Sequence, residues 1–162
     1  MLPEELTKFM GKSGDVMVME VGKGGIRRYA DAVGDHNPLY WDESYARSLG
    51  YGSIVAPPGF FGWPAKWTGA MPISSELRDG AIATATQLGY DRILDGGIEY
   101  EFLYPIQAGD TLASLERIVD IREREGKMGR MVFLTTEITF TNQNGTLVAK
   151  ARQSLIFGGK SD

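Results

Sequence analysis

The segment Gly34-Asp35-His36-Asn37-Pro38-Leu39-Tyr40 gathers the side chains that could move protons. Asp35 can act as a carboxylate base, His36 is the only histidine of the chain, and Tyr40 is a phenol. An imidazole with a pKa near ~6.5 exchanges protons at neutral pH, whereas a phenol with a pKa near ~10 is a poor base. The segment therefore predicts acid–base chemistry centred on Asp35, with a weak partner at Tyr40.

A second informative segment is the apolar stretch from Pro57 to Trp67, which carries no charge before Lys66. A segment that is apolar on every side must be buried. We expect it to form a central helix wrapped by a curved antiparallel sheet. The segment Thr68–Asp95 lacks a clear pattern, and we interpret it as an insertion or a lid.

The proton-moving segment is flanked by short helices in the first half of the chain. Apolar residues at Ile26, Tyr29, Ala30 and Val33 have helical spacing, and Gly34 ends the predicted helix. Asp42 is a suitable N-cap for the next helix, which stops near residue 50. The loop between them, residues 35–41, is held extended by its proline. A leading helix at residues 3–10 and a strand at residues 15–21 complete this half.

The second half of the chain changes to a period of two, which is typical of strands. Strands are predicted at residues 96–105, 111–124, 132–140 and 147–157. The sequence Asn142-Gln143-Asn144-Gly145 predicts a tight hairpin turn, because Asn and Gly tolerate positive φ. Strands that follow one another through tight turns predict an antiparallel sheet and an α+β fold.

Composition excludes several classes of protein. The chain has 162 residues, 43% hydrophobic and 23% charged, which fits one globular domain spanning residues 1–162. A net charge of −4 without a basic block argues against a nucleic-acid partner. No cysteine is present, no ligand cluster has metal spacing, and no apolar run is long enough to span a membrane. We expect a cytoplasmic protein without a metal.

Read together, these segments resemble the MaoC-like (R)-specific enoyl-CoA hydratases and 3-hydroxyacyl dehydratases. Gly34-Asp35-x-Asn37-Pro38-x-Tyr40 is similar to their G-D-x-N-P-x-H signature, and Ala56-Pro57-Pro58 resembles their N-terminal dehydratase branch. The resemblance implies a hot-dog fold, in which the sheet wraps a central helix. It also implies reversible hydration of 2-enoyl thioesters to (3R)-hydroxyacyl thioesters.

The resemblance assigns roles to individual residues. Asp35 matches the catalytic aspartate, and Tyr40 takes the place of the catalytic histidine. The family's His-Gly step, whose N–H polarises the thioester carbonyl, reads here as Ala56-Pro57. Proline has no N–H, so the N–H of a following residue would have to replace it. Our candidate catalytic residues are Asp35 and Tyr40, and our candidate substrate-binding residues are Asn37, Ala56, Gly59, Phe60 and Trp63.

Simpler interpretations of the same residues remain open. Asp35 could merely shape a turn, His36 is expected to face solvent, and the aromatic residues of the apolar stretch could be core. Functionally, the favoured reading is the substrate-holding subunit of a heteromeric dehydratase whose partner supplies the Asp/His pair. The alternatives are a self-sufficient homodimeric hydratase using Asp35 with Tyr40 or His36, an acyl-CoA thioesterase, and a non-enzymatic acyl-binding module. The expected partners are an acyl-CoA or acyl carrier thioester, as substrate rather than cofactor, and a second hot-dog subunit.

Overall fold

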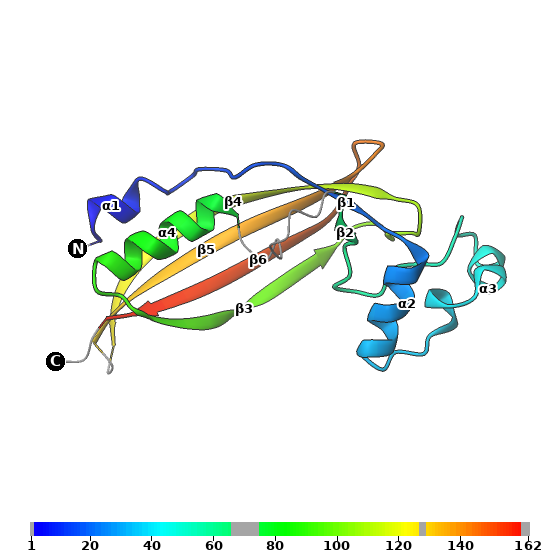
Figure 1. The fold of residues 1–162 in the computed structure, drawn as a ribbon, viewed down its shortest axis with the longest axis horizontal. Coiled ribbons are helices and arrows are strands. Elements are labelled where there is room, and N and C mark those ends of the chain that lie inside the picture. The colour runs from blue at the N-terminus through cyan, green and yellow to red at the C-terminus, as the bar shows by residue number, and fades with distance from the viewer. Residues whose placement is uncertain (1, 66–74, 127–128, 160–162) are drawn as a thin grey trace.

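A long curved sheet with a helix on one face forms the body of the molecule (Figure 1). The computed structural model describes residues 2–65, 75–126 and 129–159. Neighbouring strands are antiparallel, in the order β2-β1-β4-β5-β6-β3. The strands are β1 (Met17–Glu20), β2 (Trp63–Pro64), β3 (Arg92–Phe102), β4 (Thr111–Gly126), β5 (Gly129–Asn142) and β6 (Leu147–Gly158).

The three longest strands follow the predicted alternation and hairpin. Along β4 the side chains of Leu112, Ser114, Glu116 and Ile118 are buried on one face. Between β5 and β6 the Asn142 carboxamide oxygen accepts the N–H groups of residues 144 and 146, each at 3.0 Å. The predicted strands and the predicted hairpin turn are therefore confirmed.

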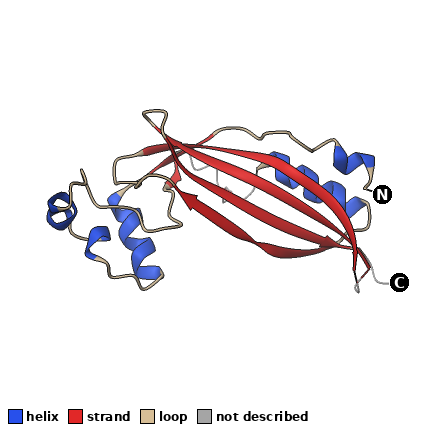
Figure 2. Cartoon of the chain, turned by 180° about the vertical axis from the view of Figure 1, so that it is seen from behind, coloured by secondary structure: helices blue, strands red, loops and turns tan. Residues whose placement is uncertain are grey.

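Helix α4 (Glu76–Gln87) lies along one face of the long strands, behind the sheet in Figure 2. The Ser75 hydroxyl caps its start by accepting the Arg78 N–H at 3.1 Å. Ala81 and Ala85 are fully buried and let the helix approach the sheet closely. Their cluster includes side chains from three strands and from helix α1 (Glu4–Thr7), namely Leu6, Ile118, Leu134 and Phe157.

The position of the central helix was predicted wrongly. Residues 57–62 form a loop that leads into the two-residue strand β2, and the helix on the sheet is α4, inside the segment that we interpreted as a lid. The loop cannot be helical because Gly59 and Gly62 have φ values of +92° and +88°. Trp67, the last residue of the predicted helix, lies outside the described residues.

The remaining helices gather at the end of the sheet away from α4 (Figure 1). They are α2 (Lys23–Ala32), the 3-10 turn η1 (Pro38–Tyr40) and α3 (Glu43–Ser48). Asp42 caps α3 as predicted, accepting the N–H groups of Ser44 at 2.7 Å and Tyr45 at 3.1 Å. Pro38 starts the 3-10 turn, so our prediction that the whole 35–41 loop is extended was wrong.

Strand β3 is an edge strand with unusual exposure. Among the described residues it pairs with β6 alone, and it starts at Arg92, earlier than predicted. All of its residues are exposed, including the large apolar side chains Ile98, Tyr100 and Phe102. A long apolar edge of this kind offers unpaired backbone groups and apolar surface together.

Within the described residues, no helix is long and apolar enough to cross a membrane. The same part of the chain holds no group of three or more Asp, Glu or His side chains placed to bind a metal ion.

Candidate functional site

The signature loop is fixed by side chains that bond back to its own backbone. One Asp35 carboxylate oxygen accepts the Asn37 N–H at 3.0 Å, and the Asn37 side-chain oxygen accepts the Leu39 N–H at 3.0 Å. The indole of Trp41 donates to the Asp35 carbonyl at 3.3 Å. Asn37 thereby serves as the N-cap of η1, and the loop holds Asp35 and Tyr40 in fixed positions.

Tyr40 is the buried member of the loop, with 8% of its surface exposed. Burial, followed by the negative charge of Asp35, raises the pKa of the Tyr40 phenol above its ordinary value near 10. The phenol therefore stays protonated at neutral pH. It can donate a hydrogen bond, but it cannot take the proton that the family's histidine takes.

This protonation state predicts how stability changes at alkaline pH. Because the folded-state pKa of Tyr40 is raised, its contribution to stability is complete below the unfolded pKa of ~10 and is lost as pH rises through the folded-state pKa. Tyr40→Phe should therefore lose less stability above pH ~10 than the unmodified chain. Denaturant unfolding across this pH range measures the difference.

The control for the alkaline experiment is Tyr45→Phe, since Tyr45 is 42% exposed on the neighbouring helix. This change removes the same hydroxyl group from an exposed position. Identical alkaline slopes for Tyr40→Phe and the unmodified chain would contradict the raised pKa of Tyr40.

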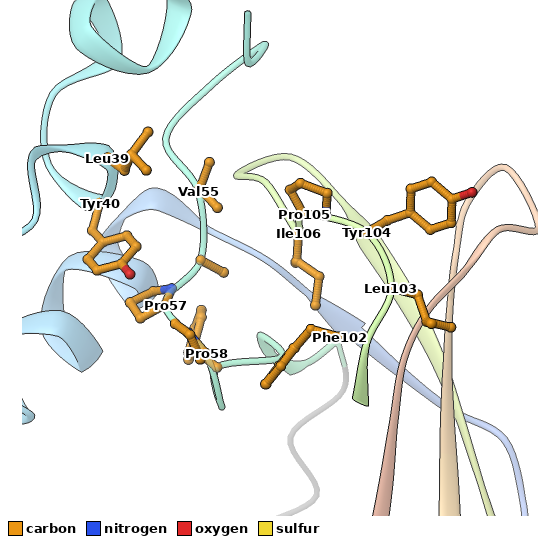
Figure 3. Close-up of a pocket in the computed structure, with 12 residues that line it drawn as sticks. Leu39, Tyr40, Val55, Pro57, Pro58, Phe102, Leu103, Tyr104, Pro105 and Ile106 are labelled. Carbon is orange, nitrogen blue, oxygen red and sulfur yellow. The ribbon is translucent and has the colours of Figure 1, made fainter. Parts of the chain in front are cut away.

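A first cavity of ≈ 320 Å³ opens beside the signature loop (Figure 3). One wall consists of Leu39, Tyr40 and residues 55–58, and the other consists of Phe60 and the end of β3 with its exit, residues 102–106. The Tyr40 ring lies beside Pro57, and Phe102 faces the proline pair from the opposite wall. The lining is almost entirely apolar, as expected for an acyl group rather than a charged ligand.

Most backbone donors near the proline pair already have partners. The Val55 N–H bonds to the Leu39 carbonyl at 3.0 Å, and the Ala56 N–H bonds to the Ile106 carbonyl at 2.7 Å. The Phe60 N–H bonds to the Pro57 carbonyl at 3.0 Å. Pro57 and Pro58 have no N–H, and the Gly59 N–H forms no hydrogen bond within the described residues. The Gly59 N–H is therefore available to a ligand, whereas the Phe60 N–H is not.

A second cavity of ≈ 440 Å³ lies on the other side of Phe60. Its walls come from β1, α2, residues 59–63, the start of α4, and strands β3, β4 and β5. The Phe60 ring packs against Tyr29 at 5.4 Å and against Trp63 at 6.1 Å between ring centroids. Phe61 stacks on Phe140 at 4.0 Å. Phe60 lines both cavities and separates them.

The close packing around Phe60 depends on two glycines. A Cβ at Gly25 of α2 would lie 2.7 Å from Phe60 Cζ and 2.8 Å from the Trp63 ring nitrogen. A Cβ at Gly59 would lie 2.7 Å from the Tyr29 hydroxyl. The helix and the loop therefore meet at a distance that only glycine permits.

The structure distributes the predicted site residues over three places. Tyr40 and Ala56 line the first cavity, Gly59 and Trp63 line the second, and Phe60 lines both. Asp35 and Asn37 sit on the signature loop and are not among the residues that line these two cavities. His36 is exposed, as predicted. The catalytic and substrate-binding roles of these residues stay predictions.

Sequence reasoning missed the charged and hydroxyl-bearing residues that line the second cavity, among them Ser75, Arg78 and Glu116. The first two fall in the segment that we interpreted as a lid. Glu116 could have been found, because it shares the inward parity of Leu112 and Ile118 along β4. A charged residue on the buried face of a strand is a signal that our reading of the apolar pattern overlooked.

The chain matches a known protein family over most of its length. The pattern of the family described as "FAS1-like, dehydratase domain region" matches residues 8–151. A UPF0336 protein from Saccharopolyspora erythraea is 34% identical over 145 residues, covering 88% of this chain and 84% of that protein.

Solved structures show the same fold. A chain of the ChsH1-ChsH2 complex from Mycobacterium tuberculosis superposes with a TM-score of 0.83, covering 98% of this chain and 92% of that chain at 19% identity. A chain of the C-terminally truncated HadBC (3R-hydroxyacyl-ACP dehydratase) complex from the same organism has a TM-score of 0.65 at 25% identity, covering 91% and 96%. The curved sheet around α4 is the hot-dog fold that the resemblance implied.

Proposed function

We propose a function from the premise that this chain belongs to the FAS1-like, MaoC-like dehydratase family. In this proposal the chain holds a 2-enoyl or (3R)-hydroxyacyl thioester for a second hot-dog subunit, which performs the acid–base step. One observation carries the proposal. The position of the family's histidine is occupied by a buried phenol whose raised pKa keeps it protonated. The chain keeps an apolar cavity and Asp35, but it lacks the histidine that is paired with this aspartate in the family's signature.

The thioester carbonyl has a suitable hydrogen-bond donor at Gly59. This N–H forms no bond within the described residues, and it sits next to Phe60, which lines both cavities. A positioned backbone donor stabilises the negative charge that develops on a thioester oxygen. In our proposal Gly59 binds the carbonyl, and Tyr40 contributes a neutral wall to the first cavity.

The second subunit is expected at the β3 edge. This strand has a free edge and exposes Ile98, Tyr100 and Phe102, and residues 102–106 also form one wall of the first cavity. A partner that pairs with β3 would cover this apolar surface and close the cavity at once. The HadBC structure is that of a complex, and this supports a two-subunit arrangement for this chain.

The test is hydration of a short 2-enoyl-CoA, followed by loss of the conjugated thioester absorbance. The isolated chain should bind the thioester but not hydrate it. Addition of a hot-dog subunit that carries the intact Asp/His signature should produce activity that saturates at equal amounts of the two chains. Asp35→Asn should change the activity of the complex by less than about tenfold, and Asp31→Asn, near the end of α2, serves as control.

A different outcome would identify the self-sufficient alternative. If the isolated chain hydrates the substrate and Asp35→Asn reduces its rate by ~100-fold or more, Asp35 is the catalytic base and our proposal is wrong. Release of free CoA by the isolated chain would instead identify a thioesterase.

A further inference from the structure

A pair of opposite charges is buried in the wall of the second cavity. Arg78 comes from the first turn of α4, and Glu116 comes from the inner face of β4. They are 8% and 9% exposed, and Arg78 Nη1 lies 3.6 Å from Glu116 Oε1. Buried ion pairs seldom add net stability, because both ions lose their hydration. Stabilisation of the fold is therefore a weak explanation for the presence of this ion pair.

The hydrogen bonds around the pair are incomplete. Arg78 Nη1 donates to the Gln153 side-chain oxygen at 3.1 Å, and the Ser75 hydroxyl donates to Glu116 Oε2. Glu116 Oε1 is buried and has no hydrogen-bond partner within the described residues. Its separation from Arg78 exceeds hydrogen-bond distance. A buried acceptor without a donor is unfavourable, and its position in a cavity wall leaves room for an external donor.

The rest of the cavity is largely apolar. Met17, Met19, Phe61, Tyr100 and Ile138 line it together with the polar group, and Asp15 and Ser114 add two further polar side chains. An apolar cavity with a few converging polar side chains has the composition of a small-molecule site, in which the polar groups fix the ligand's orientation.

We propose that Arg78, Glu116 and Ser75 form a subsite for a hydroxyl group carried on the acyl part of the thioester, remote from the carbonyl. The inference rests on the proposed function, since it specifies the substrate class of the same site. A hydroxyl can donate to Glu116 Oε1 and accept from the Arg78 guanidinium. The charges of the pair cancel, so a terminal carboxylate would meet Glu116 as well as Arg78 and gain little.

The subsite can be reached from the thioester position. Gly59, the candidate carbonyl donor, lines the same cavity as Arg78 and Glu116. A ligand whose carbonyl is bound by the Gly59 N–H can therefore extend past Phe60 and Phe61 toward the start of α4. The rings of Phe61 and Tyr100, 5.6 Å apart between centroids, would contact its apolar middle.

The experiment compares the affinity of the full chain for saturated acyl-CoAs that end in a methyl, hydroxyl or carboxyl group, at several matched chain lengths. Saturated chains are used because they cannot be hydrated. At the length that reaches the pair, the hydroxyl-terminated ligand should bind roughly ten- to a hundredfold more tightly than the methyl-terminated one, as expected for a hydrogen bond to a charged group.

The informative variant is Arg78→Met combined with Glu116→Leu, which removes both charges and leaves no ion unpaired. It should lose the preference for the hydroxyl and bind the methyl-terminated ligand at least as well. The matched control, Arg122→Met with Asp120→Leu, removes a half-exposed pair outside the cavity and should keep the preference.

Two results would overturn the subsite without affecting the proposed function. They are equal affinity for all three ligands in the unmodified chain, and a hydroxyl preference that survives in the Arg78/Glu116 double variant. Tightest binding of the carboxyl-terminated ligand would likewise reject a hydroxyl subsite. Failure to bind any of the acyl-CoAs would overturn both the subsite and the proposed function.

Discussion

Arg78→Met alone is expected to destabilise the folded chain by about 3–5 kcal/mol, because it leaves the Glu116 carboxylate buried without its counter-ion. The change keeps most of the side-chain volume, so the loss reports charge rather than packing. Denaturant unfolding at neutral pH measures it.

The matched comparison is Arg122→Met, which removes an arginine whose guanidinium lies 3.4 Å from Asp120 with half of its side chain exposed. Surface pairs of this kind contribute about 0–1 kcal/mol. The Arg78→Met/Glu116→Leu double variant should recover much of the stability lost in Arg78→Met. If Arg78→Met were no more harmful than Arg122→Met, the pair would not be buried as the structure places it.

Phe157→Ala is expected to cost about 3–5 kcal/mol of unfolding free energy. Phe157 on β6 is fully buried and packs in the cluster that joins α4 to the sheet, with Ala81 and Ala85 on the helix. Their side chains are too small to fill the space left by a phenyl ring. The fold should survive, with a lower denaturant midpoint.

Phe133→Ala is the control for Phe157→Ala. Phe133 lies on β5, is only half-buried, and has the Arg124 guanidinium 5.7 Å from its ring centroid. Its loss should be clearly smaller, below about 2 kcal/mol. Equal losses at the two positions would mean that α4 does not cover Phe157.

Much of the fold could be predicted from local patterns. Alternation along residues 132–140 and the Asn142–Gly145 turn fix a hairpin within a few residues, and Asp42 marks a helix start by its capping chemistry. These signals are local, and the structure confirms them. The resemblance of the signature loop then supplied the fold that the strands alone left undefined.

The central helix could not be predicted in the same way. The stretch from Pro57 is apolar enough for a buried helix, but two glycines with positive φ make it a loop. Its Phe60 ring packs against Trp63, and its Phe61 ring stacks on Phe140 of β5. The helix that lies on the sheet is α4, which has no strongly apolar face. The apolar side chains that it buries are small, because the helix must fit closely against the curved sheet. Burial against a distant surface decided both outcomes, and no local pattern reports it.

Sequence patterns indicate only those parts of the candidate site whose residues are close together in the chain. Asp35 and Tyr40 belong to one short motif, so their proximity is encoded in the sequence. Arg78 and Glu116 lie on a helix and a strand far apart in the chain, and their meeting depends on how α4 sits on β4. Only the folded structure brings them together.

The exposed edge at β3 also affects how such a chain can be produced. If the chain were synthesised without a partner, it would expose this apolar edge strand to other copies of itself. Such edges are templates for aggregation. If the edge is covered by a second subunit, the chain's measured stability depends on that subunit's concentration. A cell would then benefit from making the two chains in equal amounts. Recombinant production of this chain would benefit from co-expression with the second subunit.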